Sequence, residues 1–251
     1  IGENGFKGIR ISTRPDAVDG EICDILEKYH VTAVELGAQS TNDKVLAMNR
    51  RGHTREDIFR SARLLKERGF ELGLQMMTGL YGSNDEDSIG TARDIISLSP
   101  DTARIYPTVV IESTELAELY RNGEYRPQTP EEAAVLCAKI LPMFERAGIK
   151  VIRLGLHSGG DVEGSFVAGA YHPALREMCE GHIYFDIINK ALSGKEKGKY
   201  IIYVAPREVS KASGQRRCNI EKLRELGYEC RIKENAALSA RDITLEKVNL
   251  L

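Results

Sequence analysis

Short apolar runs alternate with amphipathic helical patterns along residues 8–106, and this alternation constrains the fold more than any other feature of the chain. Strands that alternate with helices pair in parallel, because each helix returns the chain to the same end of the sheet through a right-handed crossover. We therefore predict an α/β fold around a parallel sheet. The expected strands span residues 8–12, 33–36, 71–77 and 102–106, and the expected helices span residues 19–29, 54–68 and 85–98.

Capping residues mark where several of these helices begin. Asp19 precedes the first helix, and Thr54 with Asp57 three residues later forms the capping-box pattern before the second. Thr129, followed by a proline, predicts the start of a longer helix that continues to residue 146. These local signals agree with the helical periodicity, so we place the helix starts with more precision than the ends.

The strand–helix rhythm changes after Pro107, and we divide the chain into residues 1–110, 111–194 and 195–251. In the middle part we expect helices at 114–122, 129–146, 173–180 and 186–192, a strand at 150–156, a glycine-rich loop at 157–161 and a polar linker at 193–199. In the last part we expect a strand at 200–204, a helix at 208–212, a basic loop at 214–217, a helix at 219–226 and a return strand at 228–233.

Composition excludes several classes of protein. With 251 residues, 42% of them hydrophobic, the chain can bury a large core, and its net charge of -2 is not that of a general polyanion binder. No apolar run approaches the length that spans a bilayer. The five cysteines are scattered without a C-x-x-C pair, which predicts free thiols in a reducing compartment, such as the cytoplasm, and no metal site.

Polar side chains follow three successive predicted strands at their carboxyl ends, where parallel sheets bind ligands. Ser12 and Arg14 follow the first strand, Gln39 follows the second, and Gln75 lies near the end of the third. Arg51 follows Gln39 at the next loop. We interpret these side chains as one shared pocket, although the arginine could be a solvated surface residue and either amide could satisfy a buried backbone group.

An ordered set of motifs resembles the radical S-adenosylmethionine (SAM) superfamily, in the branch of the Elongator catalytic subunit and its short bacterial relatives. The resemblance covers residues 6–195. Its motifs are Ile-Ser-Thr-Arg-Pro-Asp at 11–16, Glu-Leu-Gly-Ala-Gln-Ser at 35–40, Arg-Arg-Gly-His-Thr at 50–54, Met-Thr-Gly-Leu-Tyr-Gly at 77–82 and Arg-Ile-Tyr-Pro-Thr at 104–108.

The resemblance implies a partial (β/α) barrel, and barrels of this family hold SAM and a [4Fe-4S] cluster. A helical extension is expected to follow the barrel. In that superfamily the cluster reduces SAM to methionine and a 5′-deoxyadenosyl radical, which abstracts hydrogen from the substrate. The family's three-cysteine motif after the first strand is absent from this sequence. Because such clusters need thiolate ligands, we expect this chain to lack the first barrel strands and the cluster ligands, and to be inactive alone.

The same resemblance assigns roles to five residues. It implies that Ser12 lies near the ligand, that Gln39 lies near the SAM ribose or methionine part, and that Arg51 binds the SAM carboxylate. A guanidinium suits a carboxylate because it binds it through two parallel hydrogen bonds. Gln75 stands where relatives place an acid or a histidine near the ribose, and its amide cannot act as a base at neutral pH. Arg14 is expected to line the mouth of the site.

The last part of the chain resembles a KH-type βααβ unit, which grips single-stranded nucleic acid with a Gly-x-x-Gly loop. Here the loop is Gly-Gln-Arg-Arg at 214–217, so an arginine replaces the final glycine. The resemblance implies that Lys211, Arg216 and Arg217 contact the phosphates of tRNA or another RNA. The alternative is a capping unit whose basic loop only faces solvent.

Two hypotheses from different classes follow. In the first, the intact protein is a radical SAM enzyme, with RNA as a candidate substrate, and this chain is most of its barrel and its C-terminal part. In the second, the chain is a noncatalytic nucleic-acid-binding or scaffold protein. The sequence leaves the substrate and the oligomeric state open.

Overall fold

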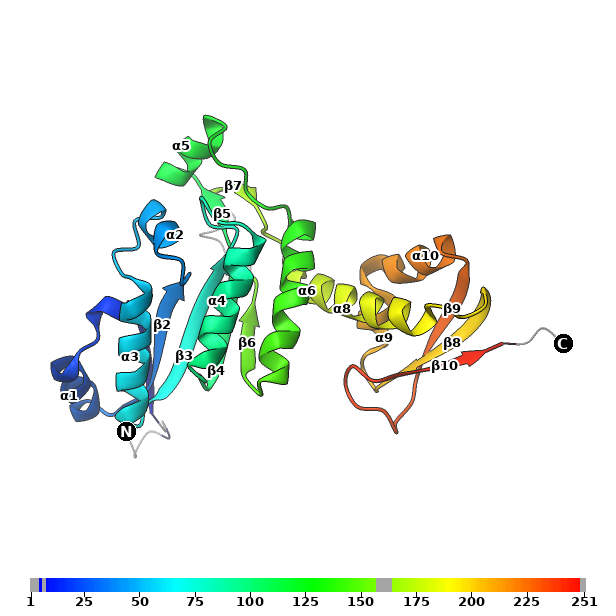
Figure 1. The fold of residues 1–251 in the computed structure, drawn as a ribbon, viewed down its shortest axis with the longest axis horizontal. Coiled ribbons are helices and arrows are strands. Elements are labelled where there is room, and N and C mark those ends of the chain that lie inside the picture. The colour runs from blue at the N-terminus through cyan, green and yellow to red at the C-terminus, as the bar shows by residue number, and fades with distance from the viewer. Residues whose placement is uncertain (1–4, 6–7, 157–163, 249–251) are drawn as a thin grey trace. The chain divides into compact units, whose positions relative to one another are not determined.

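A computed structural model describes residues 5, 8–156 and 164–248 of the chain. The glycine-rich loop expected at 157–161 lies outside these residues. The chain divides into two compact units, Ile1–Pro173 and Ala174–Leu251, which we describe one at a time (Figure 1).

The first unit is built on a five-stranded parallel sheet in the order β1-β2-β3-β4-β6. Helices α3, α4 and α6 pack side by side over this sheet (Figure 1). The α/β fold with parallel strands predicted from the sequence is therefore confirmed. The strands are β1 (Ile9–Thr13), β2 (Val31–Gln39), β3 (Glu71–Thr78), β4 (Thr102–Pro107) and β6 (Lys150–Leu154). The helices are α1 (Gly20–Lys28), α2 (Asp43–Met48), α3 (Arg55–Glu67), α4 (Asp85–Ser97), α5 (Glu115–Arg121) and α6 (Pro130–Arg146).

The two faces of this sheet differ in chemistry. On one face, apolar side chains such as Leu36, Leu74 and Ile105 are fully buried. Successive residues of a strand point to opposite faces, so the other face carries the alternate positions. There, Glu35 lies opposite Gly73, and the next pair along β3 and β4 is Gln75 and Arg104. This second face is therefore polar.

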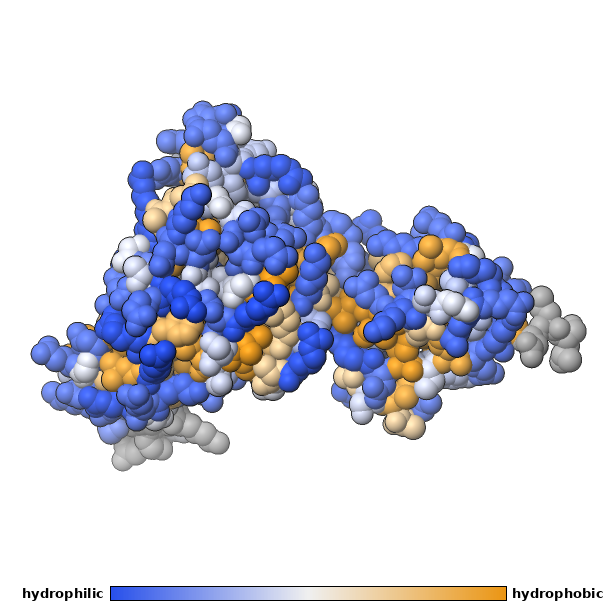
Figure 2. All heavy atoms as spheres, in the orientation of Figure 1, coloured by the Kyte–Doolittle hydropathy of each residue, from blue (hydrophilic) through white to orange (hydrophobic). Residues whose placement is uncertain are grey.

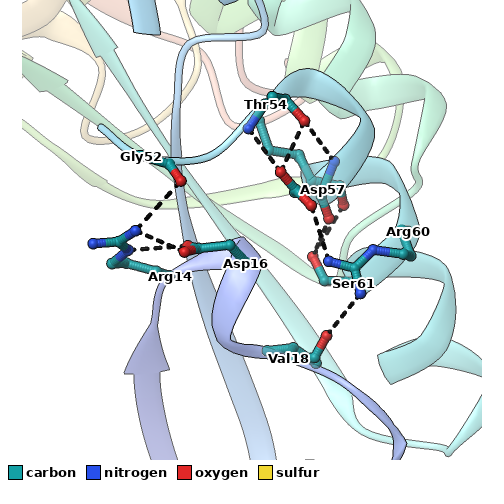
Figure 3. Close-up of polar contacts among 9 residues, drawn as sticks. Arg14, Asp16, Val18, Gly52, Thr54, Asp57, Arg60 and Ser61 are labelled. Atoms are coloured by element: carbon teal, nitrogen blue, oxygen red, sulfur yellow. Dashed lines mark hydrogen bonds and ion pairs between the residues drawn. The ribbon is translucent and has the colours of Figure 1, made fainter. Parts of the chain in front are cut away.

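The predicted caps are present in atomic detail. The Asp19 carboxylate accepts a hydrogen bond of 2.9 Å from the backbone N–H of Ile22. Thr54 and Asp57 form a capping box at the start of α3, in which each side chain accepts from the backbone N–H of the other (Figure 3). Thr129 caps α6 in the same way with Glu132. Each cap satisfies backbone donors that have no partner within the helix.

Several short elements were not predicted. Helix α2 and the antiparallel pair β5 (Val109–Ile111) and β7 (Phe166–Gly169) are too brief for their periodicity to be visible. The pair carries α5 on a small core of its own, with Val110, Ala117 and Tyr125 buried at its centre.

The second unit contains α8 (Leu175–Leu192) and a three-stranded sheet in the order β10-β8-β9. Strand β8 (Gly198–Val204) pairs in parallel with β9 (Tyr228–Glu234) and antiparallel with β10 (Ile243–Lys247). Between β8 and β9 lie α9 (Val209–Ser213), a short 3-10 turn and α10 (Cys218–Glu225). The expected order strand, helix, basic loop, helix, strand is therefore present, with β10 added. The likeness to a KH unit stays a prediction.

One prediction in this region was wrong. The helical stretches expected at 173–180 and 186–192 are a single helix, α8, which begins one residue after the start of the second compact unit at Ala174. Gly181 obscured its continuity, because glycine disfavours a helix interior. A Cβ at Gly181 would lie 3.5 Å from the Cα of Gly214, an ordinary van der Waals distance, so the packing at this position does not require glycine.

The face of the chain shown in Figure 2 is largely hydrophilic, with apolar residues in smaller patches. None of the helices in the described ranges is both long and apolar enough to cross a membrane.

Candidate functional site

A buried carboxylate joins three strands on the polar face of the sheet. Glu35 is 1% exposed, its Oε1 accepts a hydrogen bond from Gln75 Nε2 at 2.6 Å, and the same oxygen forms an ion pair with Arg104 Nε at 2.7 Å. Arg104 in turn donates to the hydroxyl of Tyr106 at 3.0 Å. Oε2 of Glu35 is buried and has no hydrogen-bond partner within the described residues. The sequence left open whether Glu35 is structural or functional, and the structure makes it the centre of a network.

Ser12 and Gln75, two of the residues singled out from the sequence, share this face. Ser12 is exposed and pairs in register with Glu35, so its side chain points to the same side as that carboxylate. Gln39 has a φ of 63°, and a Cβ placed on Gly37 would lie only 2.7 Å from its Nε2. The amide of Gln39 therefore folds back over Gly37. The structure brings Ser12 and Gln75 to one side of neighbouring strands, whereas Gln39 follows an irregularity in β2 and pairs in register with the buried Met76.

Arg14 follows β1 and is engaged by an acid (Figure 3). Its Nε and NH2 groups donate to Asp16 at 2.9 and 2.6 Å, and NH2 also lies 3.5 Å from the carbonyl of Gly52. These hydrogen bonds lower the pKa of Asp16. Arg14 lies next to the loop that carries Arg51, but its charge is largely balanced by its neighbour.

Arg51 is in a different state. Its Nε is buried and has no hydrogen-bond partner in the part of the chain that the structure describes. Burial, and secondly the nearby charge of Arg14, lower the pKa of Arg51. A half-buried guanidinium without an acid beside it is costly unless an anion completes it. The arrangement can hold a carboxylate or a phosphate.

His53, which the sequence gave no reason to separate from an ordinary helix-start residue, belongs to the same loop. It is 5% exposed, and its Nε2 lies 3.1 Å from the carbonyl oxygen of Ala38. Because a carbonyl only accepts, Nε2 carries the proton, and the buried Nδ1 is left as an acceptor without a partner among the described residues. The contact ties the Arg51 loop to the end of β2.

The polar residues therefore fit a ligand with a carboxylate and hydroxyl groups, but the thiols do not fit an iron–sulfur cluster. All five cysteines are free, and all but Cys218 are buried. Burial raises the pKa of Cys137 to about 12 and that of Cys230 to about 11, so both are protonated at neutral pH. Within the described ranges, no three histidine, cysteine or acidic side chains form a group that could hold a metal ion.

A separate cleft of about 580 Å³ opens beside the loop after β3. It is lined by residues 79–85 and by Glu124, Tyr125, Arg126 and the first turns of α6. Tyr125 closes its floor, where its hydroxyl donates to the carbonyl of Gly79 at 2.6 Å. None of the five residues proposed from the sequence to contact SAM lines this cleft.

The basic loop of the second unit presents two arginines in an unusual conformation. Gly214, Arg216 and Arg217 have φ values of 73°, 51° and 64°. Both arginines are exposed. Left-handed backbone is costly for a residue with a side chain.

Lys211, the third basic residue expected to contact RNA, differs from these arginines. Its Nζ lies 2.7 Å from Glu208 and 3.8 Å from Glu180, and both acids are nearly buried. The lysine is therefore held within the protein, and the structure does not group it with the exposed arginines.

Comparison with known proteins identifies the class. Residues 2–95 match the radical SAM superfamily, and residues 100–184 match the Radical_SAM C-terminal domain. The chain belongs to the radical SAM superfamily, whose members use SAM and a [4Fe-4S] cluster.

Within the superfamily, the chain is similar to the Elongator branch, as predicted. It is 36% identical over 142 residues to a tRNA uridine(34) acetyltransferase of Methanocaldococcus jannaschii, a match that covers 54% of this chain and 26% of the relative. It is 34% identical over 146 residues to human Elongator complex protein 3, covering 54% of this chain and 25% of that protein.

A solved structure supports the same relationship. The archaeal Methanocaldococcus infernus Elp3 with an N-terminal deletion superposes with a TM-score of 0.60 at 29% identity, covering 74% of this chain and 42% of that one. The chain thus spans about a quarter of the length of these curated relatives.

Proposed function

We propose that this chain forms the SAM-binding part of a radical SAM enzyme that acts on RNA. The observation that carries the proposal is the buried Nε of Arg51, which has no hydrogen-bond partner among the described residues, together with a polar sheet face that includes Ser12 and Gln75 and with Gln39 at the end of β2. A sulfonium nucleoside with an amino-acid tail has the matching groups, namely a carboxylate and two ribose hydroxyls.

In this proposal each side chain has a defined task. Arg51 binds the carboxylate of SAM, and Ser12 offers a hydroxyl to the amino-acid part. Gln39 and Gln75 hydrogen-bond the ribose, and Arg14 lines the mouth of the site. A cluster held outside this chain would supply the radical chemistry, and the contribution of these residues would be to orient the nucleoside and exclude water.

The cluster ligands are proposed to lie outside this sequence. The thiols here are scattered and mostly buried, and the described residues hold no group suited to a metal. We therefore propose that this polypeptide alone is inactive and that it becomes active together with a cysteine-bearing segment. Free thiols suit the reducing cytoplasm, which we propose as the site of action.

RNA is the proposed substrate class, for two reasons. Relatives such as the Methanocaldococcus jannaschii enzyme act on tRNA by their names, and the second unit exposes Arg216 and Arg217 to solvent. The acetyltransferase activity of those relatives is not carried over, because this chain covers only 26% of the length of the first.

The SAM site is tested by calorimetric titration of SAM and S-adenosylhomocysteine into this chain. We expect Arg51→Ala to weaken binding roughly 10- to 100-fold, since a hydrogen bond to a charged group contributes about 1.5–3 kcal/mol. Arg50→Ala is the matched control, because Arg50 is exposed and paired with Glu115 at 2.7 Å. Equal affinities of both variants and the wild type would contradict the assignment.

The class of function is tested on the intact protein after anaerobic reconstitution with iron and sulfide. Production of 5′-deoxyadenosine from SAM supports the enzyme. A reconstituted, cluster-loaded protein that leaves SAM intact would favour the noncatalytic nucleic-acid-binding or scaffold alternative.

The RNA contact is tested separately by tRNA retention at several salt concentrations. Replacing Arg216 and Arg217 together with glutamate should lower affinity and flatten the salt dependence, because fewer counterions are released. Retention unchanged by the double substitution would reject this loop as the contact.

A further inference from the structure

We propose that Glu35 is a positioning residue, which together with Arg104 fixes the amide of Gln75 so that its carbonyl oxygen faces the ligand. The inference rests on the proposed SAM site and adds to it the direction of one hydrogen bond. Gln75 would accept from a ribose hydroxyl rather than donate to one.

The direction follows from the chemistry of Glu35. An ionised carboxylate only accepts hydrogen bonds, so the group that Gln75 turns toward it must be the NH2 of the amide. The Nε2 of Gln75 lies 2.6 Å from Glu35 Oε1, and the Nε of Arg104 lies 2.7 Å from the same oxygen. Arg104 forms an ion pair with this carboxylate, and a carboxylate that only accepts hydrogen bonds keeps the amide from turning over.

The other end of the Gln75 amide is left open. Gln75 is partly exposed, and its Oε1 makes no hydrogen bond within the described residues and is not buried. Because Gln75 and Glu35 share the polar face with Ser12, that oxygen is an acceptor available to a ligand on this face. A ligand at this point must therefore supply a donor, such as a hydroxyl group.

Gly73 makes the network possible. It lies opposite Glu35 in register, and a Cβ at this position would be 3.0 Å from Glu35 Cγ and 3.2 Å from Thr102 Oγ1. The absence of a side chain on β3 thus leaves space for Glu35 to cross from β2 and reach both donors. Gly73→Ala is therefore a second way to disturb Glu35 while keeping its charge.

The first test observes the amide directly in the ligand-free chain. In ¹H–¹⁵N spectra of the wild type, the Gln75 side-chain NH2 should show one strongly hydrogen-bonded proton, shifted downfield and slow to exchange. Glu35→Gln should return it to the position of a solvated amide, and so should Gly73→Ala. A Gln75 amide that already has solvated shifts in the wild type would overturn the proposal.

The second test measures recognition of ribose hydroxyls with adenosine, 2′-deoxyadenosine and 3′-deoxyadenosine as probes. The wild type should bind one deoxy analogue roughly three- to tenfold more weakly than adenosine, the value of one hydrogen bond. In Glu35→Gln this difference should shrink to less than about twofold, because the freed amide can turn. The matched control is Glu71→Gln, which removes an acid from the same face that pairs with Arg10 instead.

The outcomes separate this inference from the proposed function. If the wild type binds SAM but Glu35→Gln keeps the full hydroxyl preference, the positioning role falls and the SAM site stands. If the wild type binds neither SAM nor adenosine, the proposed function falls and this inference falls with it. Should Glu35→Gln fail to fold, the same comparison is made with Gly73→Ala, and an unchanged preference there overturns the role of Glu35.

Discussion

Arg14 and Asp16 form a two-point ion pair at the end of β1, through hydrogen bonds of 2.9 and 2.6 Å. The pair leaves the neighbouring Arg51 as the guanidinium without an acid within the described residues. Two arginines at one mouth therefore have different tasks, since one is held by the protein and the other is available to a ligand. This difference makes the first prediction possible.

Removing the charge of Asp16 should strengthen anion binding at this mouth. In Asp16→Asn, Arg14 loses its counter-charge, so the combined positive potential near Arg51 rises. We expect S-adenosylhomocysteine to bind about two- to fivefold more tightly at low salt, with the gain lost at high salt through screening. Calorimetry at two salt concentrations measures this, and a weaker affinity at low salt would contradict it.

The Thr54 cap should contribute measurably to stability. Thr54→Ala removes an oxygen that accepts from the Asp57 N–H, and such a loss costs about 0.5–2 kcal/mol of unfolding free energy. Thr54→Ser keeps the oxygen and should remain close to the wild type. Urea unfolding followed by circular dichroism distinguishes the two variants, and equal midpoints for both would show that the cap is not needed.

Stability at high pH should depend on Tyr125. Burial raises the pKa of its phenol to about 12, from an ordinary value of 10.0. A raised folded-state pKa contributes stability that is fully present below pH 10 and is lost as the pH rises toward 12, since the unfolded chain releases the proton first. The wild type should therefore lose stability over this window more steeply than Tyr125→Phe. Parallel slopes in urea unfolding from pH 9 to 12 would refute this.

Replacing Arg217 with glycine should raise the stability of the second unit and weaken its binding to RNA. Its φ of 64° suits glycine, so Arg217→Gly should stabilise the second unit by up to about 1 kcal/mol. The same change should weaken tRNA binding and flatten its salt dependence. Thermal unfolding and filter retention measure the two effects, with Arg224→Gly as a control on a helix, where glycine should destabilise. Lower stability of Arg217→Gly would contradict the conformational argument.

Local sequence signals predicted most of the helices and strands. The caps at Asp19, Thr54 and Thr129 depend on residues three positions apart, so they are legible in the sequence and present in the structure. Helix α8 was expected as two stretches, and Gly181 inside it has low helix propensity, but the burial of Tyr184 and Ile188 in the core of the second unit supports one continuous helix. Tertiary packing overrides propensity in such places.

The candidate site could be predicted from the sequence only in part. Ser12, Gln39 and Gln75 were placed on neighbouring strand ends by position alone, and the structure puts Ser12 and Gln75 on one face, while the roles of all three toward SAM stay predictions. The link from Glu35 to Arg104 depends on the register of three strands, which no local pattern reveals. The environment of His53 likewise depends on the distant carbonyl of Ala38.

The long helix α8 has a practical bearing on how the C-terminal unit can be isolated. Tyr184, Ile188 and Leu192 fill the interior of that unit against its sheet. A truncation that starts at Lys195 would remove this helix and expose the apolar face of the sheet, which would favour aggregation. A polypeptide that starts before Leu175 retains the helix, and it is the fragment suited to RNA-binding experiments on the C-terminal unit.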